Sequence, residues 1–115
     1  MFSPEMKNFT NPLPPSEVQI LDLKIEPWED KKRYKVFLKI SEFTHPPNLN
    51  FYISTHNSEI ISEVTMIENV DTDIVFTMHL RNHHQPDQLT LTGEIFYPDD
   101  IGKVDEKSIS FNIND

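Results

Sequence analysis

The sequence has no cysteine, only two glycines and no long apolar run. Without cysteine there can be no disulfide, and this absence fits a reducing compartment. Two glycines are too few for the glycine-rich loop that cradles phosphate groups. A membrane-spanning helix needs about 18 successive apolar residues, and none occur. Because no signal peptide is visible after Met1 either, we expect a cytoplasmic protein with no membrane insertion.

Basic residues are also scarce. Ten Lys and Arg stand against nineteen Asp and Glu, which gives a formal net charge of −9. Binding to nucleic acid or to an anionic membrane requires a positive field, so this charge argues against both. Six of the ten basic residues nevertheless fall within the sixteen positions from Lys24 to Lys39. We therefore expect one basic surface on an otherwise acidic protein.

Recognisable catalytic motifs are missing as well. The chain offers no cysteine nucleophile and no Gly-x-Ser-x-Gly elbow for a catalytic serine. Carboxylates at loop tips lack the apolar pocket that would raise the pKa of one above that of another. The sequence therefore favours a non-enzymatic protein that needs no cofactor.

Five histidines and several loop acids invite a metal interpretation. His79 lies on an expected strand and His83 and His84 follow it, but their spacing does not match a zinc site. Calcium loops need tightly spaced acids with a turn glycine, a pattern that is absent. The loop acids in question are Asp71, Asp73, Asp99, Asp100 and Asp105. We interpret them as turn-forming residues and the histidines as solvated, although metal binding by the histidine group stays open.

The sequence does contain segments in which apolar and polar residues alternate. Along residues 33–43 one face carries Tyr34, Val36, Leu38 and Ile40, and the other carries Arg33, Lys35, Lys39 and Ser41. A period of two predicts a strand with one buried and one wet face, whereas a helix would scatter these side chains around its circumference. We therefore expect residues 33–43 to form the central strand of an antiparallel sheet.

Similar patterns predict seven strands in total and no helix. They cover residues 18–26, 33–43, 49–55, 59–68, 74–81, 89–97 and 109–113. The first strand changes phase between Ile20 and Leu21, which requires a bulge or a kink. Residues 98–107 are expected to form an acidic loop, and Trp28 to cap one end of the core. Short strands separated by turns indicate an all-β fold, an antiparallel sandwich of seven strands.

Residues 1–17 differ from the domain expected over residues 18–115. They hold four of the nine prolines, which predicts an extended or disordered N-terminal arm. Four apolar residues are spaced along it, namely Phe2, Met6, Phe9 and Leu13, of which Phe2, Phe9 and Leu13 are the expected anchors. One interpretation is a flexible terminus. The alternative is an arm that docks on a neighbouring molecule through these anchors.

The segment Leu89-Thr-Leu-Thr-Gly-Glu-Ile-Phe-Tyr-Pro-Asp-Asp100 resembles the F strand and exit loop of a bacterial immunoglobulin-like domain. Residues 18–113 as a whole resemble the fibronectin type III kind, and the stretch from Ile25 to Val36 is similar to small uncharacterised bacterial sandwich proteins. This resemblance implies strands A, B and E in one sheet, with C, C′, F and G in the other. The corner tyrosine and the antibody disulfide are both absent.

That arrangement predicts two distinct outer faces. The basic face would carry Arg33, Lys35, Lys39 and Arg81. The neutral face would carry Asn50, Tyr52, Thr90, Thr92, Phe96 and Ser110. Low charge combined with tyrosine and phenylalanine is typical of an interface core, although it is also ordinary for the wet face of a strand. We expect Tyr52 and Phe96 to form one exposed apolar patch.

The sequence therefore favours a module for protein interaction or self-assembly that uses the neutral face, the arm, or both. Its partner would be a protein, with another copy of the chain as one option. A carbohydrate-binding sandwich that uses Tyr52 and Phe96 is an alternative. A further alternative is an accessory domain of a larger enzyme complex.

Overall fold

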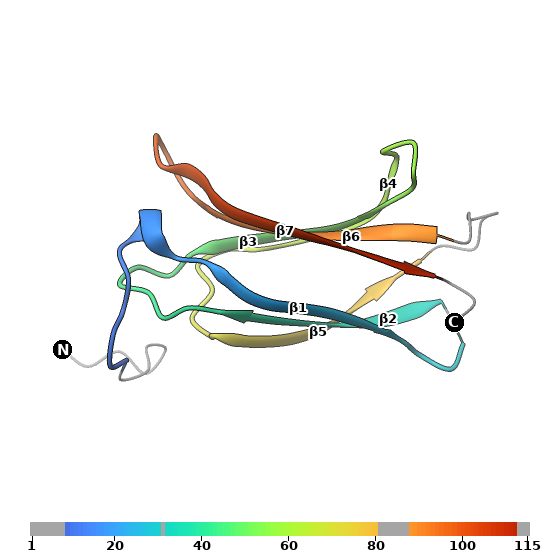
Figure 1. The fold of residues 1–115 in the computed structure, drawn as a ribbon, viewed down its shortest axis with the longest axis horizontal. Coiled ribbons are helices and arrows are strands. Elements are labelled where there is room, and N and C mark those ends of the chain that lie inside the picture. Colours follow the sequence, from blue (N-terminus) through green and yellow to red (C-terminus); the bar gives the residue numbers. More distant parts are fainter. Residues whose placement is uncertain (1–8, 31, 81–87, 113–115) are drawn as a thin grey trace.

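The computed structural model describes residues 9–30, 32–80 and 88–112, which form two antiparallel sheets packed face to face (Figure 1). One sheet has the strand order β1-β2-β5 and the other β4-β3-β6-β7. The strands are β1 (Ile20–Pro27), β2 (Arg33–Ile40), β3 (Asn48–Ser54), β4 (Ile60–Met66), β5 (Asp73–His79), β6 (Gln88–Tyr97) and β7 (Gly102–Asn112). The predicted all-β sandwich of seven strands is confirmed, and so is the division of strands between the sheets.

Strand β2 is the centre of the three-stranded sheet, as its alternation predicts. It pairs with β1 on one side and with β5 on the other. Its inward residues Tyr34, Val36 and Leu38 are almost fully buried and belong to the same core cluster as Phe51 and Leu91 of the other sheet. Each such side chain contributes roughly 1.5–3 kcal/mol when it leaves water. The sandwich is therefore held together by the interleaved inner faces of its two sheets.

The phase change predicted in the first strand is a bulge. The β1–β2 register shifts between Ile20 and Asp22, and Leu21 is 50% exposed. Beyond the bulge, Leu23 and Ile25 return to the inner face. One extra residue thus lets β1 keep its apolar side chains on the core.

Strand β7 begins seven residues earlier than predicted, so the expected loop over residues 98–107 is wrong. Only Pro98 to Ile101 form the turn, after which β7 pairs with β6 as far as Asn112. The pattern was misleading because β7 lies at an edge, where one long side is unpaired and charged residues are tolerated. A bulge opposite Ile95 and Phe96 disturbs the alternation further.

The described part of the arm, residues 9–17, bends at Thr10 and Asn11 and contains the short 3-10 helix η1 (Pro15–Glu17). Leu13 makes a parallel bridge to Phe43, and its N–H donates to the Glu42 carbonyl at 3.1 Å. The ring of Phe9 packs edge-on against Phe43 at 5.0 Å between centroids. These contacts attach the segment to its own domain, while Phe2 lies outside the described residues. The domain boundary after residue 17 stays a prediction.

Trp28 does not cap the core, so that prediction is wrong. Its side chain is 37% exposed. The guanidinium of Arg33 lies 4.4 Å from the ring centroid, and the ammonium of Lys35 lies 5.8 Å from it. Because Trp28 follows the outward Glu26 by two positions, the alternation of β1 carries its ring to the outer face.

Candidate functional site

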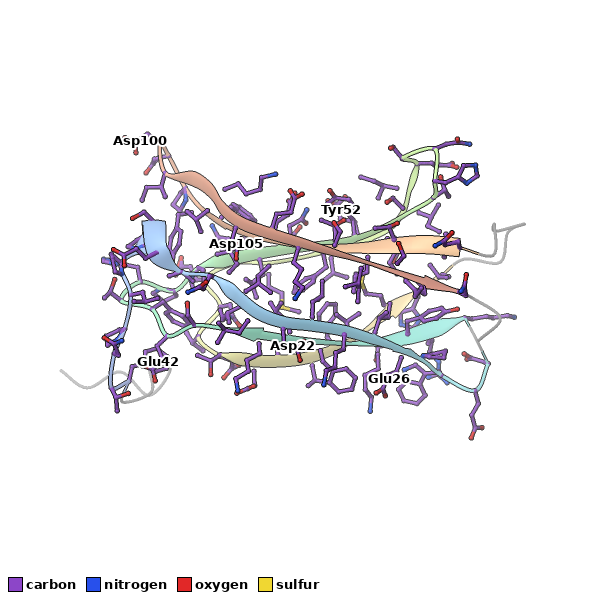
Figure 2. The ribbon with its side chains drawn as sticks, viewed as in Figure 1. Asp22, Glu26, Glu42, Tyr52, Asp100 and Asp105 are labelled. Carbon is purple, nitrogen blue, oxygen red and sulfur yellow. The ribbon has the colours of Figure 1, made fainter. Side chains whose placement is uncertain are left out.

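The six residues predicted for the neutral face lie on β3, β6 and β7 of the four-stranded sheet. The register places Tyr52 opposite Thr92, and Phe96 opposite Asn48. Figure 2 shows Tyr52 on the side of this sheet that faces away from the three-stranded one. The rings of Tyr52 and Phe96 are therefore four positions apart, roughly 13 Å along the strands. They do not form the single apolar patch that the sequence suggested.

Polar side chains occupy the space between the two rings. The Asn50 amide donates to Glu63 at 3.1 Å and to Glu94 at 3.4 Å. Its carbonyl oxygen accepts a hydrogen bond from the Thr65 hydroxyl at 2.6 Å. The ammonium of Lys103 lies 3.6 Å from Glu94. These side chains are already paired with one another, which reduces their capacity to bind a ligand.

This half of the face is charged, which corrects the expectation of a neutral surface. Strand β4 adds Glu63, and the early start of β7 adds Lys103 and Glu106. The hydrogen bond between Lys103 and Glu106 raises the pKa of the lysine and lowers the pKa of the glutamate. Thr92 is only 4% exposed, and its hydroxyl pairs with that of Ser108 at 2.8 Å.

The other half of the predicted neutral face lies around Tyr52. It includes the cross-strand pair of Thr90 and Ser110, and Tyr52 itself is half-buried. Use of this face in binding stays a prediction.

The predicted basic face carries both basic and acidic side chains. Lys39 lies between Asp22 of β1 and Asp73 of β5, and Lys35 lies opposite Glu26. The prediction counted the basic residues of this sheet and left out the acids that lie opposite them on β1 and β5. Backbone N–H donation from Lys32, together with the Arg33 side chain, lowers the pKa of Asp30. Arg81 lies outside the described residues.

Histidines and acids do not converge on a metal site within residues 9–30, 32–80 and 88–112. His45, His56 and His79 lie in the β2–β3 connection, the β3–β4 turn and β5. His83 and His84 fall outside the described ranges. Asp105 has a structural role instead, since its carboxylate accepts the Ile20 N–H at 2.7 Å (Figure 2). This hydrogen bond joins β1 to β7 across the two sheets.

One concave site was not predicted from the sequence. A pocket of about 590 Å³, here called the loop pocket, lies at the end of the sandwich where the β2–β3, β4–β5 and β6–β7 connections meet. Figure 2 shows Asp100 at this end. It is lined by Pro15, His45, Pro46, Asn48, Ile67, Glu68, Tyr97, Pro98, Asp99, Asp100 and Ile101.

Two buried side chains hold the walls of the loop pocket in place. The Tyr97 hydroxyl donates to the His45 carbonyl at 2.8 Å, and burial raises the pKa of Tyr97 to about 12. The Asn48 side-chain oxygen accepts the Glu68 N–H, also at 2.8 Å. Tyr97 and Asn48 end β6 and begin β3, so core strands position the loops.

The rim of the loop pocket is both apolar and acidic. Ile67 is 65% exposed and Ile101 is 46% exposed, although isoleucine is normally buried. Glu68, Asp99 and Asp100 are exposed beside them. A signal for this site was available in the sequence. In an antiparallel fold, alternate connections share one end, so these three connections had to meet.

No protein-family model matches the chain, and comparison with curated proteins finds no significant match. Two solved structures, each described as a glycosyl hydrolase family 2 member from Bacteroides cellulosilyticus, align with 84% of it, at 12% and 10% identity and TM-scores of 0.65 and 0.61. The β-glucuronidase of Ruminococcus gnavus aligns with the same share at 10% identity and a TM-score of 0.53.

This chain covers only 14%, 15% and 16% of those three solved chains, respectively. In the part of this chain that is described, no helix is long and apolar enough to cross a membrane. At such low identity the likeness shows the fold, an all-β sandwich that also occurs as a small part of larger enzymes.

Proposed function

We propose that this chain is a non-catalytic protein-binding module, an immunoglobulin-like sandwich of the fibronectin type III kind that binds its partner at the loop pocket. The loop pocket itself carries this proposal. Its volume falls within the roughly 300–1,000 Å³ that is usual for ligand sites. Exposed apolar side chains at such a rim, here Ile67 and Ile101, mark surfaces that become covered on binding.

The chemistry around the loop pocket supports binding rather than catalysis. Its carboxylates, Glu68, Asp99 and Asp100, are exposed to water. General acid–base catalysis by paired carboxylates needs an apolar environment that separates their pKa values. Solvated carboxylates instead provide charge selectivity at the rim of an interface.

Display selection with random peptides on the intact chain tests the proposal. Peptides that bind the wild type should lose at least about tenfold in affinity, near 1.4 kcal/mol, on the double variant Ile67→Ser, Ile101→Ser. Ile60→Ser is the matched control, because Ile60 is 51% exposed at the opposite end of the sandwich. The proposal fails if no peptide is enriched, or if the double variant binds the selected peptides as well as the control does.

A carbohydrate-associated accessory domain is the second candidate. The observation that favours it is the fold likeness to small parts of three solved chains described as a glycosyl hydrolase family 2 member or as β-glucuronidase. A glycan array probed with the intact chain and with Tyr52→Ala tests this alternative. Glycan binding that Tyr52→Ala abolishes would support it, and an array without binding would contradict carbohydrate recognition.

A further inference from the structure

We propose that the loop pocket selects a protein segment that presents one apolar side chain flanked by lysine or arginine. This inference rests on the proposed function and specifies the chemistry of the partner. The apolar side chain would enter between Ile67 and Ile101, and the cationic groups would face Glu68, Asp99 and Asp100. The pocket thus provides two complementary features at one site.

The carboxylates of the rim have no cationic partner among the described side chains. The ion pairs of residues 9–30, 32–80 and 88–112 join Asp22 with Lys24, Asp30 with Arg33, and Lys103 with Glu94 and Glu106. None of these cations lines the loop pocket. A cation brought by a partner would therefore meet acids that no described lysine or arginine already neutralises.

The apolar part of the lining is prearranged. Pro15, Pro46 and Pro98 contribute to the wall, and proline fixes its own backbone φ angle. The hydrogen bond from Tyr97 to the His45 carbonyl fixes the β2–β3 connection against β6. Little ordering is then needed when an apolar side chain enters, and preorganisation of this kind favours binding.

Backbone strain falls on two of the rim acids. Glu68 has a φ of 51° and Asp99 a φ of 64°, both in the left-handed region. Aspartate tolerates this conformation, whereas glutamate has no such advantage and glycine or asparagine would suit the position better. Residues that break local preference in this way are concentrated at functional sites. The turn itself does not favour glutamate at position 68, which supports a role of its carboxylate in binding, although Ser58 at the opposite end has a similar φ of 67°.

A second copy of the chain does not fit this chemistry. Each copy carries a formal charge of −9, so two copies repel one another. The lysines of β2 alternate with acids of β1 and β5, since Lys39 lies between Asp22 and Asp73. The complementary surface must therefore come from a different, cationic protein.

Four synthetic peptides of equal length test the inference. Their central residues are Lys-Leu-Lys, Glu-Leu-Glu, Lys-Ser-Lys and Ser-Leu-Ser, each flanked by glycine and blocked at both ends. They are titrated into the isotope-labelled intact chain, and amide shifts are followed by NMR. The Lys-Leu-Lys peptide should shift the amides of Ile67, Glu68 and residues 99–101 and bind at least about tenfold tighter than each of the others. Its affinity should fall as salt is raised, because salt screens exposed charges.

The double variant Asp99→Asn, Asp100→Asn removes two rim charges without strain, because asparagine tolerates the left-handed conformation of position 99. It should abolish the preference for Lys-Leu-Lys over Ser-Leu-Ser. The control Glu29→Gln, Glu59→Gln makes the same change in net charge at exposed positions of the opposite end. That control should keep the preference.

The inference and the proposed function fail in different ways. If binding of display-selected peptides requires Ile67 and Ile101 but the peptides show no preference for lysine or arginine, the proposed protein-binding function is supported and this inference is overturned. If concentration-dependent self-association appears in ultracentrifugation and Ile101→Ser abolishes it, the occupant is a second copy and the inference is again overturned. If the isoleucine substitutions change the affinity of none of the four peptides and of no selected peptide, both proposals fail.

Discussion

The hydroxyl of Tyr97 donates a hydrogen bond to the backbone carbonyl of His45, 2.8 Å away and 52 positions earlier in the chain. Tyr97 is 4% exposed. This one contact fixes the β2–β3 connection against the end of β6 and thereby shapes the loop pocket. We expect Tyr97→Phe to lower the free energy of unfolding by about 1 kcal/mol, since it deletes one buried hydrogen bond. Urea denaturation at neutral pH measures this change, and an unchanged midpoint would contradict it.

Alkaline pH should act on the same residue. Burial raises the pKa of Tyr97 to about 12 from its ordinary value of 10.0. The folded state therefore favours the neutral phenol of Tyr97. The unfolding free energy is unaffected by this group below pH 10, and it falls as the pH rises from 10 through 12, because the unfolded chain then loses the proton more readily. Burial raises the pKa of Tyr34 too, so this residue contributes in the same direction. Unfolding free energies measured across this window should fall less steeply in Tyr97→Phe than in the wild type.

At neutral pH, Tyr34→Phe should raise the stability of the protein, whereas Tyr97→Phe should lower it. Its side chain is fully buried, and its hydroxyl has no hydrogen-bond partner in the described part of the chain. An unsatisfied buried polar group costs about 1–3 kcal/mol. We expect Tyr34→Phe to keep the packing against the Phe111 ring, 5.2 Å away, and to raise the melting temperature. A marked loss of stability in this variant would reveal a partner for the hydroxyl.

Relief of backbone strain gives a further prediction. Glu68 is in the left-handed region, which costs an ordinary residue about 1–2 kcal/mol and asparagine less. Glu68→Asn should therefore raise the unfolding free energy by roughly 0.5–1 kcal/mol, while the backbone hydrogen bond to Asn48 stays in place. Thermal unfolding checks this expectation, with Glu59→Asn as the control in the β3–β4 turn. A lower melting temperature than that of the wild type would contradict it.

The separation of Tyr52 and Phe96 has a measurable consequence. Because these residues are four positions apart in register, their substitutions should act independently. In a double-mutant cycle, Tyr52→Ala and Phe96→Ala should add within about 0.3–0.5 kcal/mol, both for stability and for binding of any partner. A larger coupling energy would mean that the two rings contact one shared surface.

Much of the fold could be predicted because period-two patterns survive in every central strand. The alternation of Tyr34, Val36 and Leu38 identifies β2, and the phase change at Leu21 identifies a bulge. The start of β7 could not be predicted in the same way. Its first residues, such as Lys103 and Asp105, are polar. They form a strand through backbone hydrogen bonds, which produce no alternating apolar pattern in the sequence.

The loop pocket was missed for a different reason. Its lining comes from η1 and three connections that are distant in sequence, so no local spacing reveals it. The exposure of Ile67 and Ile101 was equally invisible, because sequence patterns favour burial for isoleucine. Only the end at which each connection lies could have been inferred beforehand.

The hydrogen bond between Asp105 and the Ile20 N–H also bears on fibril formation. An exposed edge strand offers free N–H and C=O groups to any passing strand, and this templating begins many aggregates. The Asp105 carboxylate occupies the Ile20 donor, and the bulge at Leu21 breaks the regular spacing that an added strand would need. These two features make the addition of a strand at the start of β1 less favourable, although β1 is an outermost strand of its sheet.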